Sequence, residues 1–135
     1  MSAFIQTNKR WFLMVGGLAV VLTIVVAAGW KQPAGGAAQE IVLVAKDSTF
    51  RLAASPDEPN PDVQLTKGNP VKLIIRNDEP EKVLHCFTIA GMDISTSRDL
   101  STGESEALSF TPDETGTFAY ACLMHPSMMG KIVVR

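Results

Sequence analysis

The sequence predicts an all-β domain, an antiparallel β-sandwich of seven to eight strands, preceded by one transmembrane helix. Three observations lead to this fold class. Beyond Gln39 no apolar run keeps a helical period for more than a turn or two. Short runs rich in Val, Ile, Phe and Thr instead alternate with turn-forming clusters of Pro, Gly, Asn and Asp. Near the start of the chain, residues 11–30 form one long uncharged apolar run.

The apolar run is predicted to cross a membrane. It begins with Trp11 and ends with Trp30, and aromatic side chains at both ends are typical of interfacial anchors. A helix that rises about 1.5 Å per residue needs about 20 apolar residues to cross the hydrocarbon core. A cleaved signal peptide, with its cleavage site near Ala37 and Ala38, is the alternative, but its apolar region is usually only about 7 to 15 residues long. We therefore expect an uncleaved anchor.

Flanking charges predict the orientation of this single-pass protein in the cell membrane. Lys9 and Arg10 precede the helix and only Lys31 follows closely, so the positive-inside tendency places residues 1–10 in the cytoplasm. Residues 31–38, rich in Ala and Gly, are expected to form a flexible linker.

The working domain is then residues 39–135, on the periplasmic or extracellular side of the membrane. It carries nine Lys and Arg against fourteen Asp and Glu, a formal charge of −5. An acidic surface favours a basic protein partner and disfavours nucleic acid. With 135 residues in all, the chain has room for one functional fold.

Eight strands are expected in this domain. They span residues 40–46, 49–53, 63–66, 71–76, 83–89, 106–110, 117–122 and 131–135. The polar segment 93–105 is expected to be a solvated loop. Short strands at this spacing predict two packed sheets.

Strand alternation places a His and a Cys in the core. Successive side chains of a strand point to opposite faces. His85 therefore falls on the same apolar face as Phe87, and Cys122 on the same face as Tyr120.

The strongest chemical signal is a loop in which Cys122, His125 and Met128 follow one another at intervals of three residues. A strand ends at this loop and another begins, so a thiolate, an imidazole and a thioether come together. A His from a distant strand can complete the set. Two His and one Cys in a plane with a weak axial Met are the ligands of a blue-copper site.

At these residues the sequence resembles the cupredoxin family. The run Cys-x-x-His-Pro-x-Met over residues 122–128 is similar to the ligand loop of its amicyanin-like and plastocyanin-like members, and the resemblance extends over most of residues 40–135. It implies a Greek-key β-sandwich with one mononuclear type 1 copper that cycles between Cu2+ and Cu+. The ligands that the resemblance implies are His85, Cys122 and His125 in the equatorial plane and Met128 on the axis.

Cys86 leaves two other readings open. It could form a disulfide with Cys122, as is common outside the cytoplasm, or join a structural zinc site. Because Cys86 directly follows His85, alternation is expected to turn its thiol away from Cys122, which disfavours the disulfide. His85 and Cys86 then point to opposite faces and cannot both reach one tetrahedral ion, which disfavours zinc. We expect a buried free thiol. Many cupredoxins have Asn at this position, where it helps to tie the ligand loops together, so the resemblance does not extend to the hydrogen bonding of this side chain.

The function expected from these ligands is one-electron transfer to or from a redox protein on the outer face of the membrane, such as a cytochrome or a membrane oxidoreductase complex. Four ligands leave no open position for a small-molecule substrate, so an enzyme is not expected. An oxidase or reductase would need more His than the two present. The alternative is a copper-handling protein, a chaperone, sensor or resistance factor that binds Cu(I) through the His/Cys/Met loop. The Met residues that cluster in sequence around the site favour it, namely Met92, Met124, Met128 and Met129.

Overall fold

The computed structural model describes residues 37–135. The predicted cytoplasmic segment 1–10, the transmembrane segment 11–30 and residues 31–36 of the linker lie outside the described residues. Among those that are described, no helix has the length and hydropathy needed to span a membrane. The anchor and its orientation therefore stay predictions.

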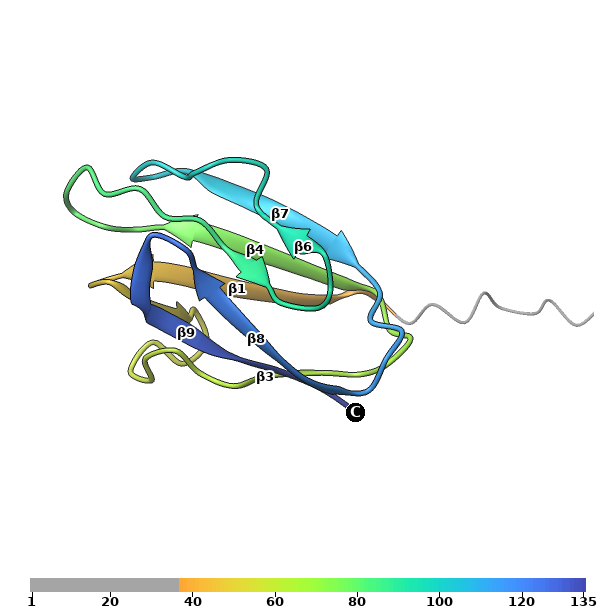
Figure 1. Ribbon diagram of the computed structural model, residues 1–135. Coiled ribbons are helices and arrows are strands. Elements are labelled where there is room, and N and C mark those ends of the chain that lie inside the picture. The colour runs from red at the N-terminus through yellow and green to blue at the C-terminus, as the bar shows by residue number, and fades with distance from the viewer. Residues whose placement is uncertain (1–36) are drawn as a thin grey trace, which may run out of the picture. The chain divides into compact units, whose positions relative to one another are not determined.

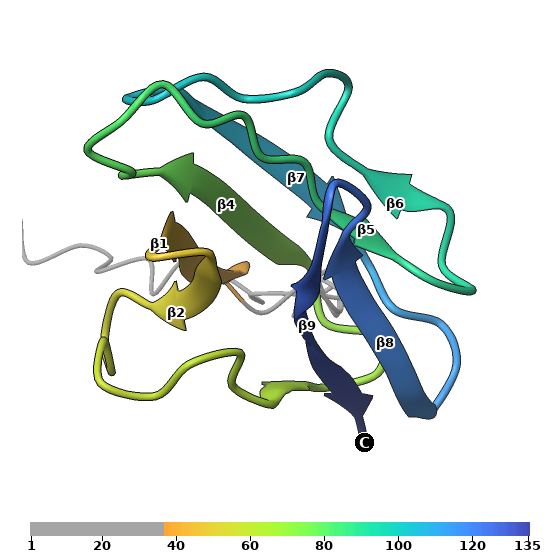
Figure 2. The same ribbon diagram turned by 60° about the vertical axis from the view of Figure 1, so that its left-hand side comes forward.

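The described residues form two β-sheets that face each other (Figures 1 and 2). The strands are β1 (Gln39–Lys46), β2 (Thr49–Leu52), β3 (Val63–Leu65), β4 (Val71–Asn77), β5 (Thr88–Ile89), β6 (Ile94–Ser95), β7 (Ser105–Phe110), β8 (Gly116–Cys122) and β9 (His125–Val134). One sheet has the order β2-β1-β4-β7 and the other β3-β9-β8-β5-β6. The predicted all-β sandwich is confirmed, with nine strands in residues 37–135 instead of seven or eight.

Two strand pairs correct the expectation of a purely antiparallel sandwich. β1 pairs with β4 in parallel, and β3 pairs with β9 in parallel. Between β1 and β4 the chain passes through β3 of the other sheet, and such a crossover is what parallel neighbours require. No hairpin joins β1 to β4 or β3 to β9, so the local sequence does not indicate whether these strands run parallel or antiparallel.

The region around His85 also differs from the expected strand 83–89. Regular pairing begins only at Thr88, and His85 instead makes an isolated bridge to Leu100. The N–H of each of these two residues donates to the carbonyl of the other, at 3.1 and 2.7 Å. Leu100 is fully buried, so the segment 93–105, expected to be a solvated loop, supplies a core residue and the short strand β6.

An aromatic cluster fills the core below the ligand loop. The rings of Phe50, Phe87 and Tyr120 have centroids 5.4 to 5.7 Å apart. The buried Tyr120 hydroxyl donates to the Pro61 carbonyl at 2.8 Å. Gly130 on β9 faces this ring so closely that a Cβ there would overlap it. Tyr120 is thus held firmly on the strand that ends at Cys122.

Candidate metal centre

Three of the predicted ligands meet at one end of the sandwich. Cys122 ends β8 and His125 begins β9, so the tight hairpin places them opposite each other, next to an irregularity in the pairing between Ala121 and Cys122. His85 comes from the segment before β5, which pairs with β8. Strand pairing therefore brings a residue from a distant part of the sequence to the hairpin.

The ligand atoms of His85, Cys122 and His125 all lie within 4.8 Å of one another. Cys122 Sγ is 3.5 Å from His125 Nδ1, and the two imidazole centroids are 4.7 Å apart. Nitrogen and sulfur ligands about 2.0 to 2.3 Å from one ion in a trigonal plane are about 3.5 to 4 Å apart. The cluster is thus close to the spacing that a shared metal ion needs.

The hydrogen bonds of His85 test whether a metal fits. The ring is fully buried, and its Nε2 lies 3.1 Å from Glu79 Oε1. Its Nδ1 is the one buried side-chain nitrogen or oxygen in residues 37–135 that has no hydrogen-bond partner. An unpaired buried polar atom is costly and needs an explanation. A metal ion bound between His85 and Cys122 supplies that explanation.

Burial also favours the form of His85 that binds metal. It lowers the pKa of the His85 imidazole, although Glu79 opposes this effect. Burial alone would raise the pKa of Glu79, but hydrogen bonds from the Ser48 N–H, at 2.8 Å, and from His85 outweigh it and lower that pKa. At neutral pH the pair therefore consists of a carboxylate and a neutral imidazole with a free lone pair.

Sequence reasoning missed two residues that position His85. Glu79 and Asn77 lie between the expected strands 71–76 and 83–89, in a segment rich in turn-forming residues. The Asn77 side-chain amide donates to the carbonyls of Val83, at 2.7 Å, and Leu100, at 2.9 Å, while its oxygen accepts the Glu79 N–H at 3.1 Å. Full burial of Asn77 shows its structural role, but no spacing in the sequence indicates it.

The methionines of the loop differ in burial. Met128 is fully buried, whereas Met129 is 57% exposed and Met124 is 41% exposed. This difference agrees with Met128 as the inward-facing sulfur. Its axial role stays a prediction.

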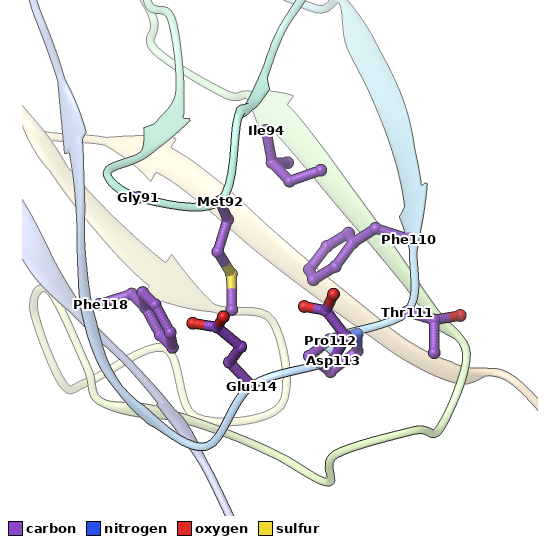
Figure 3. Close-up of a pocket in the computed structure, with 9 residues that line it drawn as sticks. All are labelled: Gly91, Met92, Ile94, Phe110, Thr111, Pro112, Asp113, Glu114 and Phe118. Atoms are coloured by element: carbon purple, nitrogen blue, oxygen red, sulfur yellow. The ribbon is translucent and has the colours of Figure 1, made fainter.

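Met92 does not lie with the proposed ligands and the other methionines, although its position in the sequence suggested that it would. It lines a cavity of about 190 Å³ with Phe110, Glu114 and Phe118 (Figure 3). That cavity lies where β8 begins, whereas Cys122 is where β8 ends. Proximity in sequence to the ligands was therefore misleading for this side chain.

The predicted direction of Cys86 is wrong. Its Sγ lies 3.6 Å from Cys122 Sγ, and both are free thiols. Burial still alternates along His85, Cys86 and Phe87, so the error lies in the expectation that Cys122 meets only the His85 face. The Cys122 sulfur accepts the Cys86 backbone N–H at 3.4 Å and so lies within reach of the Cys86 thiol. The Leu123 N–H donates to Cys86 Sγ at 3.2 Å, so Cys86 links the two ligand segments. Burial raises the pKa of this thiol, and Cys86 lies outside the group of three ligand atoms.

Comparisons with known proteins agree with this architecture. The structure is similar to auracyanin B, with a TM-score of 0.58 and 18% identity over 73% of this chain and 89% of that one. It is similar to reduced rusticyanin, with a TM-score of 0.56 and 20% identity over 75% and 83% of the two chains. It also matches the metal-binding domain of a Cu(I)-exporting P-type ATPase from Streptococcus pneumoniae, with a TM-score of 0.53 and 20% identity over 71% and 84%.

These structural likenesses show the fold. No curated protein matches the sequence significantly. The family described as cupredoxin-like domain matches residues 18–134. The fold and the His, Cys, His and Met donor set fit a single mononuclear type 1 copper site. The chain belongs to the cupredoxin-like domain family.

Proposed function

We propose that this protein is a type 1 copper protein that transfers single electrons. In this proposal His85, Cys122 and His125 are the equatorial ligands and Met128 is the axial ligand. The observation that carries the proposal is the group of ligand atoms from His85, Cys122 and His125 within 4.8 Å of one another, together with the buried, unpartnered Nδ1 of His85. The likeness to the cupredoxin family supports copper as the metal.

Copper bound here would supply a one-electron couple between Cu2+ and Cu+. The residues of the chain would hold its ligands in nearly one geometry. Glu79 fixes the His85 ring, and the Cys86 N–H donates to Cys122 Sγ at 3.4 Å. His85, Cys122 and Met128 are at most 2% exposed, which keeps water and substrates away from these three ligands. His125 is only partly buried and is the ligand through which an electron would enter or leave.

The membrane tether and the partner belong to the same proposal. The apolar run 11–30 would anchor the domain on the outer face of the membrane, where it meets redox proteins. The formal charge of −5 in residues 39–135 would steer it to a basic surface, such as that of a cytochrome or a membrane oxidoreductase complex.

A copper-handling role is the second candidate. Met124 and Met129 are exposed residues on the ligand loop and next to it, and thioether ligands suit Cu(I). One structural neighbour is a metal-binding domain of a Cu(I) exporter, solved with Cu(I).

Two measurements separate these functions. A Cu(II)-loaded electron carrier shows an intense visible thiolate-to-copper band and a reversible one-electron couple. Cys122→Ser should lose the band and Cys86→Ser should keep it, since only Cys122 belongs to the proposed ligand set. A colourless Cu(II) form, together with tight Cu(I) binding and transfer to a chelator, would favour copper handling.

A further inference from the structure

We propose that Cys86 and Cys122 form a reversible disulfide in the copper-free protein, so that this disulfide and copper exclude each other. Disulfide formation needs only the two thiols. Its exclusion of copper rests on the proposed function, because it requires Cys122 to be the thiolate ligand.

The contacts of the two cysteines carry the inference. Their sulfurs lie 3.6 Å apart although the residues are 36 positions apart in the chain. The Cys86 N–H donates to Cys122 Sγ, and the Leu123 N–H donates to Cys86 Sγ. Each sulfur thus accepts a backbone hydrogen bond from the segment that carries the other, which keeps the thiols together.

A bond between them needs only a local movement. A disulfide has its sulfurs about 2.0 Å apart, so the two atoms must approach by about 1.5 Å. Regular pairing of β5 begins at Thr88, after Cys86. His85 and Phe87 on either side are hydrogen-bonded to Leu100 and Thr96, so the approach falls on the two cysteine side chains, and no ladder hydrogen bond of β5 has to break.

Exposure predicts which cysteine reacts first. Cys122 is 2% exposed, whereas Cys86 is partly exposed. A low-molecular-weight disulfide RSSR would meet the Cys86 thiolate, which attacks one of its sulfurs and releases RS⁻. Cys122 would then attack the Cys86 sulfur of the mixed disulfide and release the second RS⁻. The protein dithiol loses two electrons and two protons, and RSSR becomes two RSH.

The product cannot hold type 1 copper. In the disulfide, Cys122 no longer provides the thiolate on which that site depends. Conversely, copper bound to Cys122 occupies the sulfur that must complete the disulfide. Excess thiol would reverse the reaction and restore the site.

The test uses the full chain, freed of metal with a chelator and treated with oxidised glutathione. We expect the wild type to lose two hydrogens by mass, to yield a peptide that links Cys86 to Cys122, and to recover both thiols with dithiothreitol. Cys122→Ser should stop at a glutathione adduct on Cys86. In Cys86→Ser, the buried Cys122 should react about tenfold more slowly than Cys86 does in the wild type. If the native wild type gives only adducts, or links its cysteines between chains, the proposal is wrong.

A second arm separates this inference from the proposed function. Copper-loaded wild type should form no Cys86–Cys122 disulfide under the same oxidant and should stop at a glutathione adduct on Cys86. The oxidised wild type should bind no copper until it is reduced. If the disulfide forms equally fast with copper bound, mutual exclusion is overturned. The reduced, copper-loaded wild type separates the two proposals. Absence of a visible copper band there would count against the proposed copper site, whereas the disulfide is scored by mass in the metal-free protein and does not depend on that band.

Discussion

The Glu79 carboxylate holds the His85 imidazole, since Glu79 Oε1 lies 3.1 Å from His85 Nε2. Glu79 is 7% exposed and His85 is 0% exposed. The same carboxylate oxygen accepts the Ser48 N–H, so Glu79 is itself fixed. A carboxylate behind a ligating His sets the orientation of the ring and raises its basicity. Glu79 is therefore a positioning residue for the proposed copper site.

Glu79→Gln should weaken Cu(II) binding by about tenfold, since partners of this kind typically contribute 10-fold to 100-fold in metal affinity. It should also raise the reduction potential, because a negative charge that favours Cu(II) is removed. Competition with a chelator and voltammetry measure the two effects. Glu104→Gln is the matched control, because Glu104 pairs with Arg98 at the surface. Equal effects of the two substitutions would show that Glu79 acts only through its negative charge and does not position His85.

The copper-free protein should lose stability in acid. Burial holds the pKa of His85 below its ordinary value of 6.5, so the unfolded chain binds this proton first as the pH falls. The free energy of unfolding should therefore decrease as the pH falls below about 6.5. The pKa of Glu79 is lowered from its ordinary value of 4.5, so its carboxylate stabilises the folded protein above pH 4.5. This contribution disappears as the carboxylate is protonated, so the free energy of unfolding should continue to fall below pH 4.5. Urea unfolding at several pH values measures how the free energy of unfolding depends on pH. His85→Asn should weaken this dependence in the upper part of the range, just below pH 6.5. A flat profile for the wild type would contradict the assignment.

The axial ligand can be identified by comparing two neighbouring methionines. Met128→Leu should leave copper bound and raise the reduction potential clearly, since a ligand that favours Cu(II) is lost from a long, weak bond. Met129→Leu should leave the potential almost unchanged, because Met129 is 57% exposed. Voltammetry of both variants in one buffer decides the matter. A large shift for Met129→Leu with none for Met128→Leu would transfer the axial role.

Gly130→Ala should destabilise the domain, because its Cβ would meet the buried Tyr120 ring, which the Pro61 carbonyl holds in place. Overpacking of this kind costs about 1 to 3 kcal/mol. Urea unfolding of the copper-free protein measures the loss. The exposed neighbour Lys131 supplies the control, since Lys131→Ala should change the stability by less than about 0.5 kcal/mol. Unchanged stability of Gly130→Ala would show that the Tyr120 ring can move aside.

The amino-terminal segment should hold the full chain in the membrane. Apolar insertion resists high salt, whereas electrostatic adsorption does not, so the protein should sediment with membranes after a salt wash. The mass of the mature chain provides the second measurement. A mature N-terminus near Gln39 would identify residues 11–30 as a cleaved signal peptide.

Local sequence by itself determined much of this protein. Alternating apolar residues, broken by Pro and Gly clusters, set most strands, and the three-residue spacing of Cys122, His125 and Met128 set the hairpin loop. These features depend on neighbours in the chain, so they can be read without a structure. The pairing of β1 with β4 could not be predicted in this way, because it joins strands that a crossover separates.

Tertiary structure alone decided the surroundings of His85. Glu79 reaches its ring because Asn77 holds the intervening loop, and Leu100 pairs with its backbone from 15 positions further along the chain. The contact between Cys86 and Cys122 depends on where β8 ends, because the Cys122 sulfur there accepts the Cys86 N–H. Alternation along one strand fixes the face that a side chain takes but not the side chains of other strands that it meets. The sequence pattern therefore separated the two thiols, and the packing of two distant segments brought the sulfurs together.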